Sequence, residues 1–273
     1  MKPLDLSISI VCKNNAATIA RTLESVRPLA SEIVAVDSGS TDGTLDLLAR
    51  AGATVIRSEW KGHVATKQMA LEACMRTWVF CIDSDESLEP ELAGEVARVV
   101  RTPTADGYHV NRKVFYQGRA LNHVWQPEWR LRLVRSGRFA WAGLDPHDKL
   151  VRAPGSSAPT TADLIGDLRH DSIDDFQSFL AKQVQHASVM ARSMRAEGRR
   201  GSVVRLVTSP PGSFLKQAVI KGGWRDGWAG LAAAMSTAVS TAMKHAILLD
   251  LSRSFGPEPG GPGSSSDSDG SGA

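Results

Sequence analysis

Paired cysteines are missing from this sequence of 273 residues. Its three cysteines, Cys12, Cys74 and Cys81, are scattered along the chain and form no C-x-x-C motif. A disulfide framework is therefore not indicated, and we expect a reduced protein of the cytoplasm.

Long apolar runs are also missing. The N-terminal segment shows no apolar stretch of signal-peptide length, so we expect the protein to stay on the cytoplasmic side. The most apolar late segment, Trp228 to Met243, has 16 residues and includes two serines and two threonines. A bilayer-spanning helix needs about 20 predominantly apolar residues, so this segment is not predicted to span a membrane.

Neither sign of charge is in large excess, because 32 Lys and Arg residues face 29 Asp and Glu residues, a net charge of +3. A nucleic-acid partner is therefore not indicated. The charge is unevenly placed, since Arg192 to Arg225 contains eight basic residues and one acid, Glu197.

The 42% of hydrophobic residues suffices for a core. Residues 256–273 are rich in Gly, Ser and Pro and are predicted to be disordered.

The first half alternates strand-like and helix-like segments with short connections. Strands are predicted at Leu6–Val11, Glu32–Asp37, Thr54–Ile56 and Trp78–Ile82, and the helix before the last of them at about Val64–Met75. This alternation favours an α/β fold with a parallel sheet covered by helices.

After Val100 the predicted strands become shorter and favour an antiparallel extension. They cover Gly107–Arg112, Val114–Gln117, Arg130–Val134 and Lys149–Arg152. A long helix is predicted over Asp174–Met194.

Three carboxylates, Asp83, Asp85 and Glu86, follow the Trp78–Ile82 strand within four positions. Ligands of open α/β sheets bind at the carboxyl ends of the strands. Carboxylates this close repel one another, and a divalent cation with a phosphate-bearing ligand would neutralise them. The D-x-D motif therefore predicts a metal and diphosphate site. The alternative is a solvated acidic turn before a helix that Pro90 opens.

Asp37 ends the second predicted strand in the same way. An acid at this place in nucleotide-binding α/β folds accepts hydrogen bonds from a base or a ribose. Together with the D-x-D motif it outlines a nucleoside diphosphate. The alternative is a turn-forming acid ahead of Ser38 and Gly39.

Several sequence blocks occur in a familiar order and spacing. In the first half they are Ser9–Asn14, Glu32–Thr44, Lys67–Gln68 and Trp78–Glu86. Together they resemble the nucleotide-sugar half of the family 2 glycosyltransferases of GT-A fold. In the second half the blocks are Trp129–Arg135, Pro146–Leu150, His170 and Lys221–Gly227. These resemble the branch that contains lipopolysaccharide-core β-glucosyltransferases.

The resemblance implies a role for each of several residues. It places Asp37 on the nucleoside, Lys67 near the ribose or phosphates, Asp83 at the nucleotide, and Asp85 on a divalent metal, Mg²⁺ or Mn²⁺. Asp148 stands where the branch usually has His-Glu, which makes it the candidate general base.

Other residues keep two interpretations. Glu128 and Asp145 are the next candidates for the base. His170 could complete the metal or phosphate site or be a structural, helix-capping histidine. Arg130 and Arg132 could offset the charge of the departing diphosphate or form a solvated face. Trp125, Trp129 and Trp141 could stack on a sugar or belong to the core.

The sequence departs from the family in two blocks. Lys13-Asn14-Asn15 stands where an acid commonly follows the asparagine, and the base position carries the shorter aspartate. The Q-x-x-R-W element of processive synthases is absent, because Trp129 precedes Arg130. Transfer of a single sugar is therefore expected.

The resemblance implies a division of the chain. Residues 1–105 would form the nucleotide-sugar-binding half and residues 106–172 the acceptor-side and catalytic half of one domain. Residues 173–255 would form a helical region that associates with a membrane.

We therefore predict a metal-dependent glycosyltransferase that moves a sugar from a nucleotide-diphosphate sugar to a glycolipid or oligosaccharide acceptor, lipid-linked or of the lipopolysaccharide-core type. One base without a protein nucleophile implies a single displacement with inversion. One alternative is a nucleotidyltransferase, which would need a glycine-rich loop where Cys12 to Asn15 offers none. The other is a non-catalytic, membrane-associated scaffold.

The basic stretch adjoins Trp224, Trp228 and the apolar late segment. Basic and aromatic residues beside an apolar helix are typical of interfacial anchors, so we expect peripheral contact with the inner face of the cytoplasmic membrane. The alternative is a solvated surface.

Overall fold

Strands and helices alternate in the first half, as its pattern predicts. A computed structural model describes residues 3–143, 148–173 and 175–254. The strands of this half are β1 (Leu6–Cys12), β2 (Glu32–Asp37), β3 (Thr54–Arg57) and β4 (Trp78–Asp83). Its helices are α1 (Ile19–Val26), α2 (Thr44–Arg50), α3 (His63–Glu72) and α4 (Pro90–Arg101). The four strands lie parallel in the order β3-β2-β1-β4.

The second half extends this sheet. Its strands are β5 (Glu86–Leu88), β6 (Gly107–Tyr116), β7 (Arg119–Ala120), β8 (Trp129–Arg135) and β11 (Thr161–Ile173). Beyond β4 the order is β8-β6-β11-β5, and β7 pairs with β6. The β4–β8, β6–β8 and β5–β11 pairs are antiparallel, whereas β6 and β11 are parallel.

Two predictions for this half need correction. The two strands predicted before and after Lys113 are one continuous strand, β6. Strand β11 was not predicted, although it lies between β6 and β5. The predicted Lys149–Arg152 strand is present as β10 and pairs with β9 (Phe139–Ala142) in a separate hairpin.

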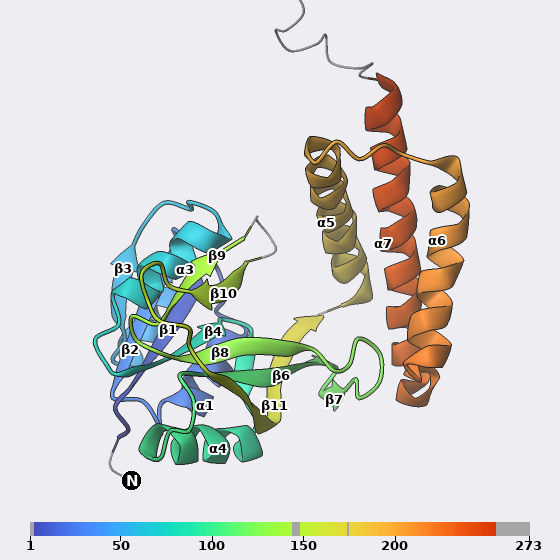
Figure 1. Ribbon diagram of the computed structural model, residues 1–273. Helices are drawn as coiled ribbons and strands as arrows, with labels where there is room; N and C mark the ends of the chain where they lie inside the picture. Colours follow the sequence, from blue (N-terminus) through green and yellow to red (C-terminus); the bar gives the residue numbers. More distant parts are fainter. Residues whose placement is uncertain (1–2, 144–147, 174, 255–273) are drawn as a thin grey trace, which may run out of the picture.

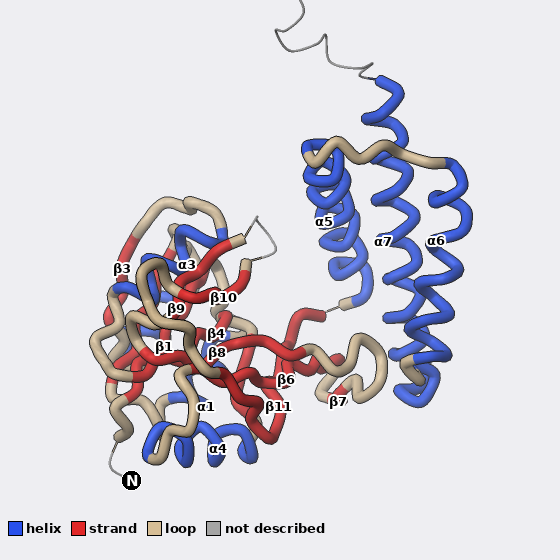
Figure 2. The backbone as a smooth tube through the Cα atoms, viewed as in Figure 1, coloured by secondary structure: helices blue, strands red, loops and turns tan. Residues whose placement is uncertain are grey.

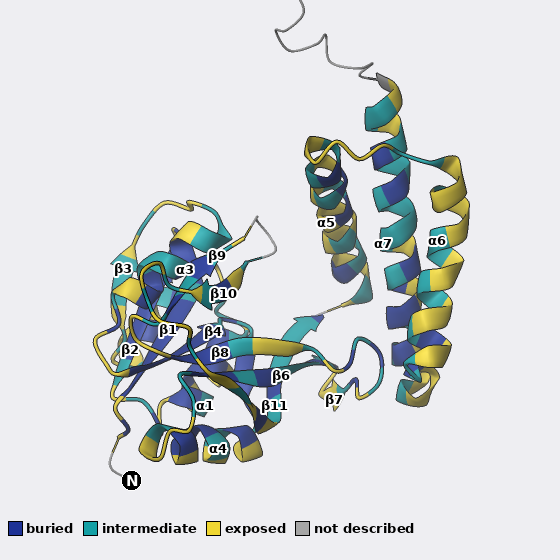
Figure 3. Cartoon of the chain, in the orientation of Figure 1, coloured by how far each residue is buried: buried dark blue, intermediate teal, exposed yellow. Residues whose placement is uncertain are grey.

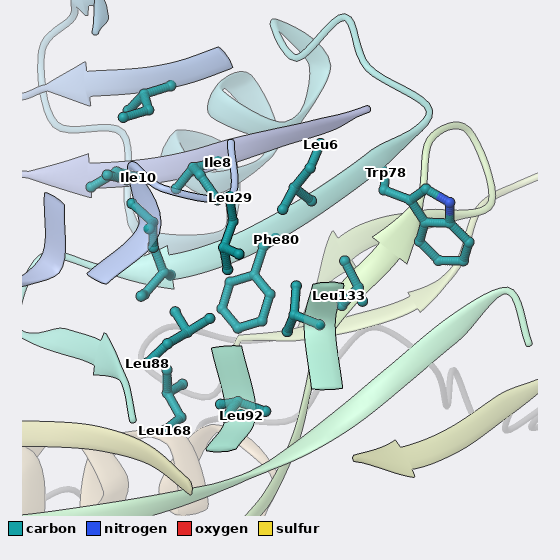
Figure 4. Packing of buried hydrophobic residues seen from close by; sticks show 14 of the residues in the cluster. Leu6, Ile8, Ile10, Leu29, Trp78, Phe80, Leu88, Leu92, Leu133 and Leu168 are labelled. Carbon is teal, nitrogen blue, oxygen red and sulfur yellow. The ribbon is translucent and has the colours of Figure 1, made fainter. Parts of the chain in front are cut away.

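The core lies on both faces of the sheet. On one face Leu6, Ile8 and Ile10 of β1 pack with Phe80 of β4 and with residues of α1 and α4 (Figure 4). On the other face α3 and the β9–β10 hairpin cover Val79 and Cys81. Strands buried on both faces are rich in apolar residues, which is why β4 and, despite Ser7 and Ser9, β1 were predictable.

Three long helices follow β11 within the described residues: α5 (Phe176–Ala196), α6 (Val203–Leu215) and α7 (Gly227–Ser254). They stand beside the α/β body, with α7 between α5 and α6 (Figure 1). A π-helical segment η1 (Lys216–Ile220) and a 3₁₀ turn η2 (Gly223–Asp226) join α6 to α7. The loop between β7 and β8 reaches from the sheet to these helices (Figure 2).

Helix α6 lies in the region predicted to be helical, although its bounds were not predicted, and much of its surface is exposed (Figure 3). Val204, Val207, Leu215 and Val219 recur at helical spacing and are all exposed, Val204 to 69%. A second exposed series on η2 and α7 consists of Trp224, Trp228, Leu231, Met235 and Val239. Within the described ranges, no helix combines the length and hydropathy that a membrane crossing requires.

Candidate active site

Asp83 ends β4 and lies between two cationic side chains. Lys67 Nζ, on α3, lies 2.8 Å from Asp83 Oδ1, and Arg132 Nη2, on β8, donates to Asp83 Oδ2 at 2.9 Å. Burial raises the pKa of Asp83, but the charges of Arg132 and Lys67 outweigh it and hold the pKa well below its ordinary value. Asp83 is therefore an anion at neutral pH.

Asp148 meets the same lysine. Lys67 Nζ donates to Asp148 Oδ2 at 2.9 Å, and neither side chain is more than 11% exposed. Burial lowers the pKa of Lys67, but Asp83 and Asp148 more than compensate and raise it above its ordinary value. The Trp141 ring lies 4.8 Å from Lys67 Nζ. Lys67 thus joins the D-x-D motif to the candidate base.

The ion pairs continue through Glu86, Arg112 and Glu128, of which only Arg112 was not named from the sequence. Glu86 Oε1 accepts from Arg132 Nη2 at 2.6 Å and lies 3.5 Å from Arg112 Nη1. Arg112 Nη2 donates to Glu128 Oε1 at 2.6 Å. Glu86 begins β5 and is buried, so the alternative of a solvated acidic turn is wrong for this residue. Three carboxylates in four positions were the available signal.

Asp85 and His170 come together from different strands. His170 Nε2, on β11, lies 3.3 Å from Asp85 Oδ2. Within the described residues His170 Nδ1 is buried without a hydrogen-bond partner, and no three His, Cys, Asp or Glu side chains converge as a metal site. One carboxylate and one imidazole are therefore available to a cation.

Asp37 is buried at the end of β2, and its carboxylate accepts hydrogen bonds from the turn that follows it. Its Oδ2 accepts from the backbone N–H groups of Gly39 and Ser40, each at 3.0 Å. Burial raises its pKa, and these hydrogen bonds, with that of the Ser40 hydroxyl, bring it below the ordinary value. This is the turn-forming interpretation, and a contact with a nucleoside stays a prediction.

The remaining candidates separate by burial. Arg132 is buried and so is not part of a solvated face, whereas Arg130 is exposed and pairs with Glu128. Trp141 is buried, and Trp125 packs on Phe179. Trp129 is 46% exposed.

A small pocket lies against the central charges. Lys67, Asp83, Arg132 and Trp141 line it together with residues of β1 and β4. Within the described residues, Arg132 Nε and Trp141 Nε1 are buried donors without a partner. The sheet thus brings six sequence-predicted residues into one area: Lys67, Asp83, Asp85, Arg132, Asp148 and His170. Asp145, the other candidate base, lies outside the described residues.

The paired charges lie at the carboxyl edge of the parallel strands, which is where open α/β sheets bind their ligands. The glycosyl transferase family 2 model matches residues 7–153, which include all four strands of the parallel sheet. A lipopolysaccharide core biosynthesis glycosyltransferase, LpsC of Rhizobium meliloti, is 32% identical over 243 residues, covering 82% of this chain and 84% of LpsC. The chain belongs to glycosyl transferase family 2 and has the family's GT-A fold.

Other similar proteins include an uncharacterised glycosyltransferase of Rickettsia prowazekii, 28% identical over 90% of this chain and 87% of the relative. Among solved structures, S. aureus TarS with UDP-GlcNAc matches at a TM-score of 0.41 and 15% identity, covering 68% of this chain and 66% of TarS. Likeness at that TM-score adds nothing to the assignment, which rests on the family match.

Proposed function

We propose that this chain is an inverting, metal-dependent glycosyltransferase that moves one sugar from a nucleotide-diphosphate sugar to a lipid-linked or lipopolysaccharide-core-type acceptor. One observation carries the proposal: Lys67 bridges Asp83 and Asp148 at the carboxyl edge of the sheet. Membership of a glycosyl transferase family supports a catalyst over a scaffold and disfavours a nucleotidyltransferase.

Asp148 is the proposed general base. An acceptor hydroxyl is a poor nucleophile at neutral pH, so a carboxylate must take its proton as the oxygen attacks the anomeric carbon. Lys67 holds Asp148 Oδ2, which leaves Oδ1 to accept that proton. The acceptor oxygen replaces the diphosphate in one displacement, so the anomeric configuration inverts.

Lys67 and Arg132 are proposed to bind the departing diphosphate. Negative charge grows on that group as the glycosidic bond breaks, and fixed cations nearby lower the barrier. The unpartnered donors Arg132 Nε and Trp141 Nε1 on residues lining the pocket support an anionic ligand, because buried donors are rarely left without an acceptor.

The residues present fit a divalent metal. Asp85 and His170 would hold it, and Mg²⁺ or Mn²⁺ takes few protein ligands when phosphate oxygens complete its shell. When bound, the metal would neutralise charge on the leaving diphosphate. We expect Asp85→Ala and an excess of EDTA each to abolish transfer, and Asp85→Ala to weaken Mn²⁺-dependent nucleotide binding by calorimetry. Full activity in EDTA would contradict metal dependence.

Assays of donors and acceptors test the reaction. Purified protein is incubated with radiolabelled nucleotide sugars and with lipopolysaccharide whose core is truncated. We expect one donor to label the acceptor with inverted configuration by NMR. Failure of every donor to label the acceptor, or a retained configuration, would contradict the proposal.

The acceptor class is proposed from LpsC, whose name places it in lipopolysaccharide core biosynthesis.

We further propose that the protein binds the inner leaflet peripherally through α6, η1, η2 and α7. From Gly198 to Leu249 the sequence has seven basic residues and one acid, Asp226. In the described structure none of these seven pairs with a carboxylate. Exposed apolar residues beside uncompensated positive charge suit an anionic lipid surface.

A further inference from the structure

The segment Lys221–Gly227 has no part in the reaction proposed above, although it is one of the blocks that carry the family resemblance. It begins directly after η1, covers the whole of η2 and includes the first residue of α7. There it contacts residues 122–126 in the loop between β7 and β8. The segment therefore joins the helices to the sheet.

Asp226 makes most of this contact. It accepts hydrogen bonds from the backbone N–H groups of Asn122, His123 and Val124 at 3.0, 2.9 and 2.9 Å, and its Oδ1 lies 2.8 Å from His123 Nδ1. Its side chain is only 3% exposed. Burial raises the pKa of Asp226, but the hydrogen bonds from His123 and the loop backbone outweigh it, and the pKa lies below its ordinary value.

The next two loop residues are held in the same way. The Trp125 backbone N–H donates to Gln217 Oε1 at 3.0 Å, and Trp125 Nε1 donates to Thr237 Oγ1 at 2.9 Å. Lys221 Nζ donates to the Gln126 carbonyl at 2.8 Å. Five consecutive loop residues thus bond to four side chains of the η1–α7 segment: Gln217, Lys221, Asp226 and Thr237. We call these four residues the loop clamp.

The glycines bring the backbone close enough for these bonds. A Cβ on Gly223 would lie 2.7 Å from the Gln217 carbonyl oxygen, and one on Gly230 would lie 2.0 Å from the Gly223 carbonyl oxygen. Both contacts are too short for any side chain. The glycines at 223 and 230 therefore let η2 pack against η1 and α7.

The loop leads directly into the active-site network. Glu128 follows it, accepts from Arg112 and Arg130, and is linked through Arg112 to Glu86. Trp129 is about half exposed beside it. An exposed indole can cover a sugar ring, and an exposed guanidinium can bind phosphate or carboxylate.

We propose that the loop clamp positions Glu128, Trp129 and Arg130 as the acceptor-binding edge of the active site, where they bind the carbohydrate of a lipid-linked acceptor. Asp226 is its main positioning residue. Trp224 and Trp228, on either side of Asp226, are exposed on the surface proposed to bind lipid. A lipid-anchored acceptor would therefore meet the membrane contact and the acceptor edge at neighbouring points. The acceptor class rests on the proposed function.

Amide hydrogen exchange tests the clamp without any assay of transfer. Asp226→Asn keeps the shape of the side chain but replaces one carboxylate oxygen with an N–H₂ group. The side chain then offers one acceptor fewer to the loop amides. We expect exchange to accelerate at residues 122–125 by 10-fold or more. A smaller acceleration is expected at Arg112, whose N–H donates to the Glu128 carbonyl, and at Glu128, whose N–H donates to Asn111 Oδ1. The matched control is Asp250→Asn, an exposed acid on the neighbouring helix α7, which should leave these amides unchanged.

Steady-state kinetics separates positioning from stability. With truncated-core lipopolysaccharide as acceptor, we expect Asp226→Asn to raise the acceptor KM about 10-fold while the donor KM stays within 2-fold. Lys221→Met, which removes one clamp bond and tests the proposal if Asp226→Asn fails to fold, should raise the acceptor KM about 3-fold. An unchanged acceptor KM in a variant whose loop amides exchange fast, or an unchanged exchange rate, would overturn the proposal. If the wild type transfers no sugar, the proposed function fails, and exchange at Glu128 still decides whether the clamp positions the acceptor edge.

Discussion

The α/β body and the three helices differ in whether their charged side chains are paired. At the carboxyl edge of the sheet, Asp83, Glu86 and Arg132 are little exposed and neutralise one another. On the helices, Arg205, Lys216 and other cations lack carboxylate partners in the described structure, and apolar residues lie outside. Buried pairing suits a site that holds an anion in a fixed geometry. Exposed, uncompensated charge suits a surface that meets another surface.

Arg132 and Arg130 test the buried side of this comparison, because they are two positions apart on β8. Arg132→Met would leave Asp83 and Glu86 buried without their shared cation. Removing one partner of a buried pair costs about 3–5 kcal/mol, whereas an exposed pair contributes at most about 1 kcal/mol. We expect urea unfolding to show that Arg132→Met lowers the free energy of unfolding by about 3–5 kcal/mol, and that Arg130→Met lowers it by at most about 1 kcal/mol.

Equal losses for the two arginine variants would contradict this difference. Arg132→Lys keeps the charge but loses the planar guanidinium whose Nη2 donates to both Asp83 and Glu86, so an intermediate loss is expected. This third variant also provides a measurement if Arg132→Met does not fold.

The candidate base gives the next largest effect. Asp148→Asn keeps size and a hydrogen bond but cannot take a proton at neutral pH, so transfer should fall by about 10²-fold or more. That is about 2.7 kcal/mol in the barrier. Donor affinity, measured by calorimetry, should change little. Asp5→Asn, an exposed acid before β1, is the matched control. An unchanged turnover would move the base to another residue.

The membrane surface gives a smaller effect. We expect the wild type to float with anionic liposomes at low salt and to dissociate near 1 M salt, where the Debye length is about 3 Å. Changing Val204 and Val207 to Ser should weaken binding by about 1–2 kcal/mol, because each valine loses part of its apolar burial in lipid. Both are exposed in the protein, so its melting temperature should hardly change.

Val184→Ser is the control for the membrane assay, because Val184 is exposed on α5, outside the proposed surface. Flotation that ignores salt, or an equal loss for the Val184 variant, would refute this assignment of the surface.

The sequence predicts best what is repeated and local. The strands β2 and β4 are apolar runs that end at Asp37 and Asp83, whereas β1 is apolar except for Ser7 and Ser9 and ends at Cys12. Strand β11 gives a weaker signal, because Gly166 interrupts it and its exposed and buried positions do not alternate regularly. The bounds of helix α6 were not predicted within the region expected to be helical, because Pro210 and Pro211 lie inside the helix.

The site residues also divide into those that a local motif identifies and those whose contacts depend on the tertiary fold. Lys67, Asp83 and Asp148 could be named from their motifs, but the lysine bridge between them depends on α3 and the segment before β10 meeting in space. Arg112 and Glu86 are 26 positions apart and carry no shared motif. Their pairing follows only from the sheet order, in which β11 separates β5 from β6.

The smallest expected effect is the dependence of stability on pH. The helices and the α/β body should lose stability at different pH values. Burial, with the charges of Lys244, Arg205 and Arg199, lowers the pKa of His245 on α7 below its ordinary 6.5. The unfolded chain then binds a proton more readily than the folded one, so stability is lost as pH falls below about 6.5. For Asp83 the folded pKa lies well below 3.8, so its contribution is present above that value and is lost only as pH falls below it. We therefore expect amide exchange around His245 to accelerate below about pH 6.5, while β4 stays protected down to about pH 4. His245→Gln should remove the first step and leave the second, and simultaneous opening of both regions in the wild type would contradict the separation.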